Sequence, residues 1–141
     1  MIEALARRPV VTAPPDEDVR AVARKMRDGH VGCVVVVEGR RPVGIVTDRD
    51  LALRVLAEGD PPDTPIAAVM SVDPTTVSLG SDVEVVLRSL RLSGTRRVPI
   101  VDEEGALVGL VSQDDLLALL ARELGALAEG LERAVDAPEL R

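Results

Sequence analysis

The sequence predicts an α/β (α+β) protein made of two similar halves, each a small β-sheet flanked by helices. The first observation behind this prediction is an internal repeat, in which residues 12–27 resemble residues 76–91 and residues 29–51 resemble residues 94–116. The second is that the hydrophobic pattern within each repeat changes from helical spacing to short runs of β-branched residues. Such a repeat indicates one structural unit used twice.

An amphipathic helix is predicted near the start of each repeat. Apolar side chains recur there at positions i, i+3, i+4 and i+7, namely Val19, Val22, Ala23 and Met26, then Val83, Val86, Leu87 and Leu90. This spacing places them on one face of a helix. Asp16 and Ser81 are the candidate N-terminal caps.

Two short strands are expected to follow each helix. They are predicted at residues 33–37 and 42–47 in the first repeat and at residues 98–101 and 107–112 in the second. Turns around Gly39 and Gly105 separate the strands. Further helices are expected over residues 48–58 and from residue 113 onward.

A stretch rich in Gly and Pro marks the predicted boundary between the two repeats. The first repeat is expected at residues 1–58, a linker at 59–65, the second repeat at 66–122 and a C-terminal helical extension at 123–141. Thr64 followed by Pro65 has the pattern of a helix cap with proline in the first turn.

The C-terminal stretch carries apolar residues at heptad spacing, namely Leu117, Leu120, Leu124, Leu127, Leu131 and Ala134. Gly125 and Gly130 interrupt it, at a cost of about 1 kcal/mol each relative to alanine. A long independent coiled coil is therefore not expected. We expect the stretch to pack against the module or against a partner subunit in a homodimer.

Composition narrows the possible functions. A net charge of −7 disfavours nucleic-acid binding, and the chain contains no Phe, Tyr or Trp on which a base could stack. No apolar run is long enough to span a membrane, and no secretory signal is visible, so we expect a cytoplasmic protein. Cys33 is the only cysteine and is expected to be a small buried hydrophobe.

One short motif occurs once in each repeat. Residues 44–50 (GIVTDRD) and 109–115 (GLVSQDD) share glycine, two apolar residues, Thr or Ser, two variable residues and Asp. Together with residues 97–102 (RVPIVD), they resemble the CBS domain, named after cystathionine β-synthase. The chain looks like a stand-alone tandem CBS pair, or Bateman module. The first repeat departs from the pattern at residues 32–36, which lack the proline, and has Ala6 where the second repeat has Met70.

This resemblance implies two repeats related by a pseudo-twofold axis, with clefts between them for an adenosine compound such as AMP, ADP, ATP or S-adenosylmethionine. It assigns ribose binding to Asp50 and Asp115, and phosphate binding to Thr47 and Ser112. Weaker candidates at the cleft edge are Thr12, Val31, Gly32, Arg49, Thr76, Arg97 and Val98. Among the arginine pairs, only Arg96-Arg97 is expected near the cleft; Arg7-Arg8 and Arg40-Arg41 are expected to be solvated surface charge.

The residue types suit this chemistry. A carboxylate accepts two hydrogen bonds from a ribose diol, and the start of a helix attracts phosphate. The same residues also form the pattern of a capping box, which needs no ligand, and the two roles are compatible.

Catalytic and metal sites are not expected. His30 and Cys33 are the sole His and Cys, too few for a structural zinc site, and no nucleophile with a base partner is visible. The sequence therefore predicts a regulatory, non-enzymatic module that requires no cofactor and senses an adenosyl ligand, with an unidentified protein as a possible target. The alternative is a ligand-free dimerisation or interaction scaffold.

Overall fold

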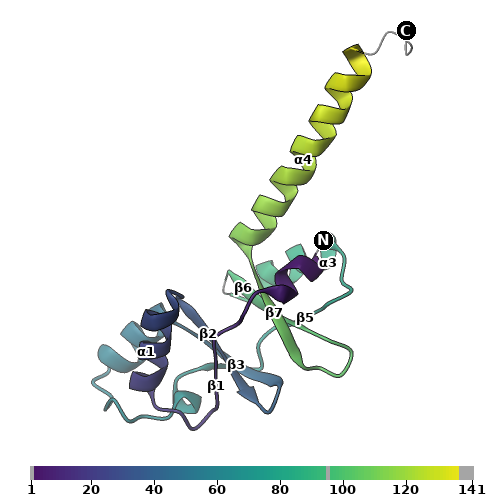
Figure 1. Cartoon of the computed structure of the whole chain (residues 1–141). Coiled ribbons are helices and arrows are strands. Elements are labelled where there is room, and N and C mark those ends of the chain that lie inside the picture. Colours follow the sequence, from purple (N-terminus) through teal and green to yellow (C-terminus); the bar gives the residue numbers. More distant parts are fainter. Residues whose placement is uncertain (1, 95, 137–141) are drawn as a thin grey trace.

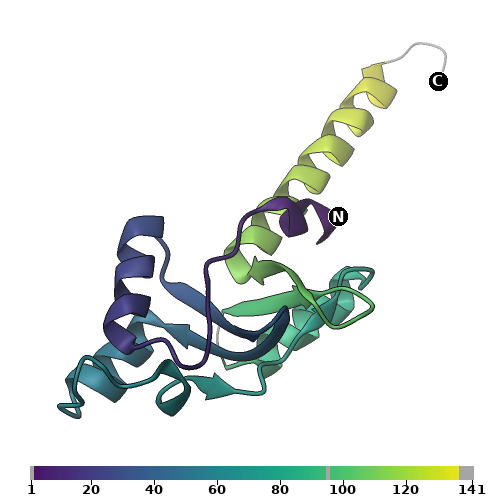
Figure 2. The same ribbon diagram turned by 60° about the horizontal axis from the view of Figure 1, so that its bottom comes forward.

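Two small β-sheets form the centre of the molecule in the computed structural model, which describes residues 2–94 and 96–136 (Figure 1). The α/β (α+β) prediction is confirmed. All four main strands lie within one residue of their predicted ends. Two views show the sheets side by side, with a long helix that leads away from them (Figure 2).

The first sheet has the strand order β1-β2-β3-β4. It consists of β1 (Thr12–Ala13), β2 (Cys33–Glu38), β3 (Arg41–Thr47) and β4 (Ser71–Val72). The pair β1–β2 is parallel, whereas β2–β3 and β3–β4 are antiparallel. Strand β4 belongs to the second half of the sequence, so the two halves exchange a segment.

The second sheet repeats this arrangement with three strands in the order β5-β6-β7. Its strands are β5 (Val77–Ser78), β6 (Arg97–Val101) and β7 (Leu107–Ser112). The pair β5–β6 is parallel and β6–β7 is antiparallel. The register shift between Ile100 and Val101 matches the shift between Val36 and Val37 in the first sheet. The internal repeat in sequence is thus a repeat in structure.

The first helix of each repeat begins later than predicted. Helix α1 spans Val19–Gly29 and helix α3 spans Val83–Leu92, and their N-caps are Asp18 and Asp82. Each carboxylate accepts a hydrogen bond from the amide three residues on, at 2.7 and 3.1 Å. The predicted caps Asp16 and Ser81 are therefore wrong, because neither lies three residues before one of these amides.

Three short helical segments lie between strands β3 and β4. Helix α2 (Asp48–Leu51) continues as the π-helical turn η2 (Ala52–Leu56), and a 3₁₀ turn η3 (Ile66–Ala68) follows the linker. The N-cap of η3 is Pro65, with no side-chain cap. The predicted cap Thr64 is wrong, because its hydroxyl donates backwards to the Pro61 carbonyl at 2.6 Å.

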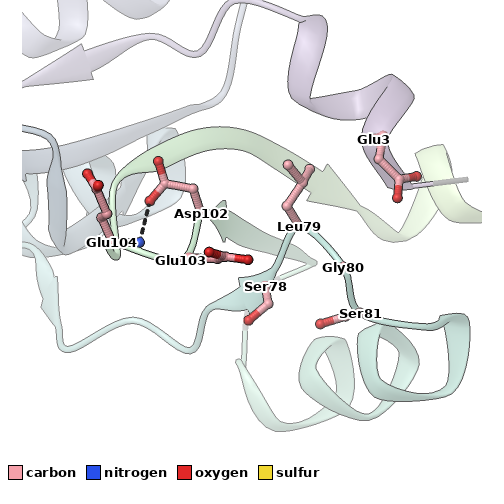
Figure 3. Close-up of a pocket in the computed structure, with 8 residues that line it drawn as sticks. All are labelled: Glu3, Ser78, Leu79, Gly80, Ser81, Asp102, Glu103 and Glu104. Carbon is pink, nitrogen blue, oxygen red and sulfur yellow. Dashed lines mark hydrogen bonds between the residues drawn. The ribbon is translucent and has the colours of Figure 1, made fainter.

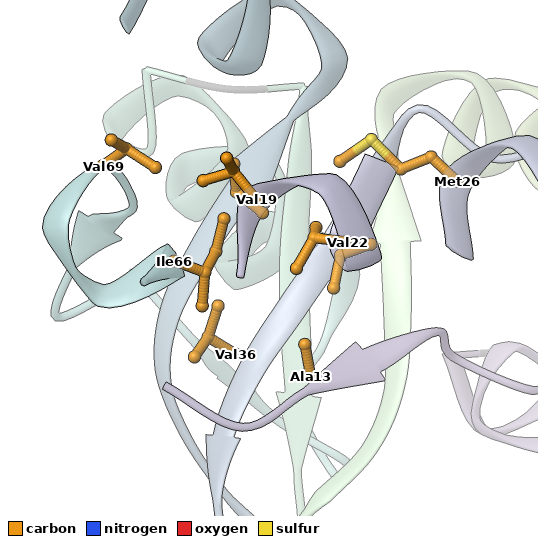
Figure 4. Packing of buried hydrophobic residues seen from close by; sticks show 9 residues of the cluster. Ala13, Val19, Val22, Met26, Val36, Ile66 and Val69 are labelled. Carbon is orange, nitrogen blue, oxygen red and sulfur yellow. The ribbon is translucent and has the colours of Figure 1, made fainter. Parts of the chain in front are cut away.

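Each sheet has its own hydrophobic core, and the two cores exchange a segment. In the first core, Ile66 and Val69 from the start of the second repeat pack against Val19, Val22 and Val36 (Figure 4). The second core receives Ile2 and Leu5 from η1 (Ile2–Arg7), the 3₁₀ turn at the start of the chain. Because each core needs residues from both repeats, they fold as one unit.

The glycine that opens each motif permits a close approach between these exchanged segments and the sheets. A Cβ atom on Gly109 would lie 2.8 Å from the Cα atom of Ala6, and one on Gly44 would overlap the sulfur of Met70. Ala6 and Met70 occupy equivalent positions before the two repeats. The motif glycines are therefore packing positions.

Helix α4 runs without a break from Gln113 to Asp136, through Gly125 and Gly130. Leu116 is buried in the second core, and Leu119 and Leu120 pack against it. Farther along, Leu124, Leu127 and Leu131 are 67, 71 and 66% exposed. The predicted heptad stripe therefore does not pack on the module beyond the first two turns (Figure 1).

Candidate functional site

Both sequence motifs form capping boxes at the end of a sheet. The Thr47 amide donates to Asp50 Oδ2 at 2.9 Å, and the Asp50 amide donates to Thr47 Oγ1 at 3.2 Å. Ser112 and Asp115 make the same two bonds at 3.3 and 3.0 Å. Each box uses one carboxylate oxygen and the acceptor side of the hydroxyl. The second carboxylate oxygen and the hydroxyl hydrogen are left for another partner.

That second oxygen has a different partner in each repeat. Asp115 Oδ1 accepts a hydrogen bond of 2.7 Å from Arg8, which precedes the first strand. Asp50 Oδ1 lies 3.6 Å from Arg54 on the same helical segment. Arg54 also donates to the Val69 carbonyl at 2.9 Å, so it ties η2 to the exchanged segment.

The Asp115 motif lies on a cavity between the two repeats. This cavity, of about 270 Å³, is here called the Asp115 cleft. It brings together four predicted residues, Val31, Gly32, Arg97 and Asp115. The other lining residues are Arg8, Pro9, Val10, Val11, His30, Cys33 and Leu110.

The remaining predicted residues do not line the Asp115 cleft. Val98 is fully buried in the second core, and the Thr12 carbonyl accepts a hydrogen bond from Lys25. Arg49 and Thr76 are exposed. Thr47 and Asp50 form the first capping box, and Ser112 forms the second, beside the cleft.

The repeat alignment places a second, smaller pocket opposite the Asp115 cleft. It measures about 90 Å³ and is lined by Ile45, Ser71, Val72, Asp73, Pro74, Thr75, Ser93 and Arg97. Asp50, the counterpart of Asp115, is not among these lining residues. Arg97 lines both spaces, whereas its counterpart Gly32 has no side chain to fill either. The two clefts are therefore unequal, and the larger one contains the motif carboxylate.

The Asp115 cleft has more positive than negative lining groups in a chain of net charge −7. Arg8 and Arg97 oppose a single lining carboxylate, Asp115. Burial alone would raise the pKa of Asp115, but hydrogen bonds from Ser112 and Arg8 outweigh burial and lower its pKa below the usual 3.8. Asp115 is therefore ionised at neutral pH and acts only as an acceptor.

Cys33 forms part of the cleft wall and is 4% exposed, as the sequence predicted for a buried hydrophobe. Burial raises the pKa of its thiol from 9.0 to about 11; the nearby carboxylates of Asp50 and Asp48 add to the rise, while Arg97 opposes it. The thiol is neutral at physiological pH and is a poor nucleophile there.

Cys33 is expected to react slowly with a thiol-modifying reagent while the protein is folded. Only the thiolate attacks, and both burial and the raised pKa keep its population small. Because the unfolded thiol ionises first, folding stability should also fall as the pH rises from 9.0 to about 11. The rate at which the reagent labels Cys33 is measured by mass spectrometry, with urea-unfolded protein as the control. Equal rates in the two states would contradict the prediction.

A wider and more open pocket, of about 910 Å³, lies away from the motifs (Figure 3). Four carboxylates surround it, those of Glu3, Asp102, Glu103 and Glu104. Asp102 is already used within the β6–β7 turn, where it accepts hydrogen bonds from the amides of Glu104 and Ala106 at 2.9 Å. This pocket would repel a phosphate.

Within residues 2–94 and 96–136, no group of three or more His, Cys, Asp or Glu side chains is arranged to hold a metal ion. The helices of the same ranges include none that is both long and apolar enough to cross a membrane.

Sequence reasoning missed two polar residues of the cleft. Arg8 is exposed, as expected for surface charge, but the expectation that only Arg96-Arg97 lies near the cleft is wrong, because Arg8 bonds Asp115 and lines the cavity. His30 ends helix α1 in a left-handed conformation, with φ of 52°, and lines the same cavity. The Gly29-His30 sequence signals a helix end, but the contact between Arg8 and Asp115 spans 107 positions and has no local signal.

Comparison with known proteins identifies the repeat. The family model described as the CBS domain matches the chain twice, over residues 2–57 and 66–122. An uncharacterised protein of Methanopyrus kandleri is 41% identical over 115 residues, which cover 80% of this chain and 59% of that protein. The chain thus spans less than two thirds of the length of that relative.

Two further relatives are similar along more of their length. The CBS domain-containing protein YhcV of Bacillus subtilis is 36% identical over 107 residues, which cover 76% of each chain. The structure of a CBS domain protein from Pyrobaculum aerophilum, complexed with AMP, matches with a TM-score of 0.72 at 30% identity. That match covers 85% of this chain and 98% of the other. With two family matches that together cover most of its length, the chain belongs to the CBS domain family as a tandem pair.

Proposed function

We propose that the chain is a regulatory module that binds an adenine nucleotide or a related adenosyl compound in the Asp115 cleft. The observation that carries the proposal is the position of the motif carboxylate on an inter-repeat cavity beside two arginines. The AMP complex of the similar Pyrobaculum aerophilum protein supports the class of ligand. The proposal includes a cytoplasmic location and an unidentified protein target, and it assigns no catalytic step to the chain.

The cleft offers a chemically suitable group to each of adenine, ribose and phosphate. Val11, Val31 and Leu110 offer aliphatic surface for a base, in a chain without aromatic side chains. Asp115 offers a carboxylate to the ribose hydroxyls, and Arg8 and Arg97 offer positive charge to a phosphate. A ligand that contacts both repeats would favour one relative position of the repeats, which is how binding would regulate a target.

The absence of Trp and Tyr makes a direct test possible. The purified chain scarcely absorbs in the near ultraviolet, so an adenine ring that co-purifies would dominate its spectrum. Added AMP at 100 times its dissociation constant should stabilise the fold by about 2.7 kcal/mol, measured by circular dichroism during heating. An adenine-free spectrum, together with unchanged melting in AMP, ATP and S-adenosylmethionine, would overturn the proposal.

A second role, as an interaction scaffold, is favoured by the exposed leucines of helix α4. A heptad stripe is self-complementary under twofold symmetry, and we propose that it pairs two copies of the chain in a homodimer. The positions beside the stripe are mostly uncharged: Ala121, Ala128 and Gly130 flank it, and Glu123 is the one acidic neighbour. Nucleotide binding and dimerisation are compatible, because the exposed Leu124, Leu127 and Leu131 begin nine residues beyond Asp115 on helix α4.

Replacing Leu127 by glutamate is expected to convert the dimer to a monomer. Burial of a leucine contributes about 1.5–3 kcal/mol, and the twofold pair loses it twice while gaining two buried charges. Ala126→Glu is the control, because it adds the same charge one position away from the stripe. Light scattering after size exclusion gives the mass of each variant. A monomeric parent chain would contradict the homodimer.

A further inference from the structure

We propose that Arg8 selects nucleotides with a 5′-phosphate, by exchanging its bond to Asp115 for a bond to the phosphate. This inference rests on the proposed function of the Asp115 cleft. It adds what that function leaves open, namely which adenosine compounds the cleft accepts and which residue discriminates among them.

The first step of the argument is that the carboxylate is already occupied. Asp115 Oδ2 accepts the Ser112 amide in the capping box, and Oδ1 accepts Arg8 at 2.7 Å. A carboxylate has about four acceptor sites, and the Ser112 amide and Arg8 use one on each oxygen. A ribose diol at Asp115 approaches the oxygen that Arg8 contacts, so the hydroxyls and the guanidinium compete for Oδ1. The ligand therefore competes with an existing contact.

The second step is that the displaced guanidinium stays at the cleft. Arg8 lines the cavity, and its side chain is 61% exposed, so the side chain has room to turn while its backbone stays in place. A guanidinium has five N–H donors in a planar fork that matches a phosphate. Together with Arg97, it would place two cations beside a bound phosphate.

The third step is a charge argument about other ligands. The sulfonium of S-adenosylmethionine is a cation where AMP has its phosphate. Arg8 and Arg97 repel that cation, and the carboxylates that could offset them are Asp115, Asp48 beside Gly32, and Asp50, which is paired with Arg54. Asp115 would be engaged by the ribose. The cleft is therefore suited to a phosphate rather than a sulfonium.

The equivalent site at Asp50 has no arginine in the position of Arg8. Val72 stands where Arg8 stands in the repeat alignment, and Asp50 is paired instead with Arg54, from its own helical segment. Arg54 is also bonded to Val69, so it cannot leave without loosening the first core. Selection by phosphate is therefore confined to the Asp115 cleft.

The test compares AMP, adenosine and S-adenosylmethionine on the full chain by isothermal titration calorimetry. The parent chain should bind AMP more tightly than adenosine. Arg8→Gln should lower the AMP affinity about 10-fold or more, since it removes a charge-assisted bond to phosphate. The same variant should leave the adenosine affinity equal or higher, because the competitor for Asp115 is gone. Arg8→Lys should retain part of the preference for AMP.

Arg88→Gln is the matched control, because it removes an exposed arginine that is paired with Glu84 on helix α3, away from the cleft. It should change none of the three affinities. An AMP affinity unchanged in Arg8→Gln, or equal losses for AMP and adenosine, would overturn the role of Arg8 and leave the proposed function intact. Failure of all three compounds to bind the parent chain would overturn both.

Discussion

Asp115→Asn is expected to lower the affinity for adenosine about 10- to 100-fold, whereas Asp50→Asn changes it by less than about 3-fold. A carboxylate accepts both ribose hydroxyls, but an amide offers only one oxygen acceptor and loses the charge. Asparagine still accepts the Ser112 amide, so the capping box and the fold are preserved. Calorimetric titration of both variants checks the prediction.

The unequal effect follows from the two cavities. Asp115 lines a space of about 270 Å³, while the pocket at the equivalent place measures about 90 Å³ and does not include Asp50 among its lining residues. Arg97 accounts for part of this difference. It lines the smaller pocket at the position that Gly32, which has no side chain, holds in the Asp115 cleft. We therefore expect one adenosine compound per chain.

Adenosine is the better ligand for this comparison, because AMP reports two changes at once. Removing the charge of Asp115 also releases Arg8, which would strengthen a phosphate contact and mask part of the loss. Asp115→Ala serves as the second variant, and loss of the bond from the Ser112 amide should destabilise its fold by about 1 kcal/mol. Equal losses in the Asp50 and Asp115 variants would contradict the single-cleft prediction. Unchanged adenosine binding in both Asp115 variants would mean that Asp115 has only a structural role in the capping box.

Much of this fold could be predicted from local pattern. The β-branched runs around Val35 and Ile100 are buried on both faces, and such runs are typical of central strands. The helix starts were missed by one or two residues because several acids and hydroxyls precede each helix. Asp18 and Asp82 were recognisable in retrospect, since they are identical in the repeat alignment.

The exchanged segments could not be predicted from the sequence. The turns η1 and η3 are only six and three residues long, and nothing local says that Leu5 packs in the second core while Ile66 packs in the first. The site depended on the same long-range geometry. The motif nominates Asp115, but its partner Arg8 reaches it only because η1 crosses to the second repeat.

Gly109→Ala is expected to destabilise the fold by about 2 kcal/mol, within the usual cost of overpacking a core. The new methyl would lie 2.8 Å from Ala6 Cα and 3.2 Å from both Ala6 N and Ile100 Cδ1. Backbone atoms cannot rotate away, so relief requires η1 to move off the second sheet and withdraw Ile2 and Leu5 from its core.

Gly44→Ala is the matched control in the other repeat, where the added methyl meets the side chain of Met70. Methionine is flexible and adapts to a changed cavity, so Gly44→Ala should destabilise the fold by less than about 1 kcal/mol. In the double variant Gly44→Ala/Met70→Ala, the added methyl should cost nothing beyond the effect of Met70→Ala alone. Urea unfolding followed by circular dichroism measures all four variants. If η1 detaches in Gly109→Ala, the dependence of unfolding free energy on urea should also fall, because less surface remains to be exposed. Equal costs at the two glycines would instead mean that η1 yields as readily as one methionine side chain. In that case η1 would be bound too weakly to the second sheet to hold Arg8 against Asp115, and the proposed selection of phosphate would lose its structural basis.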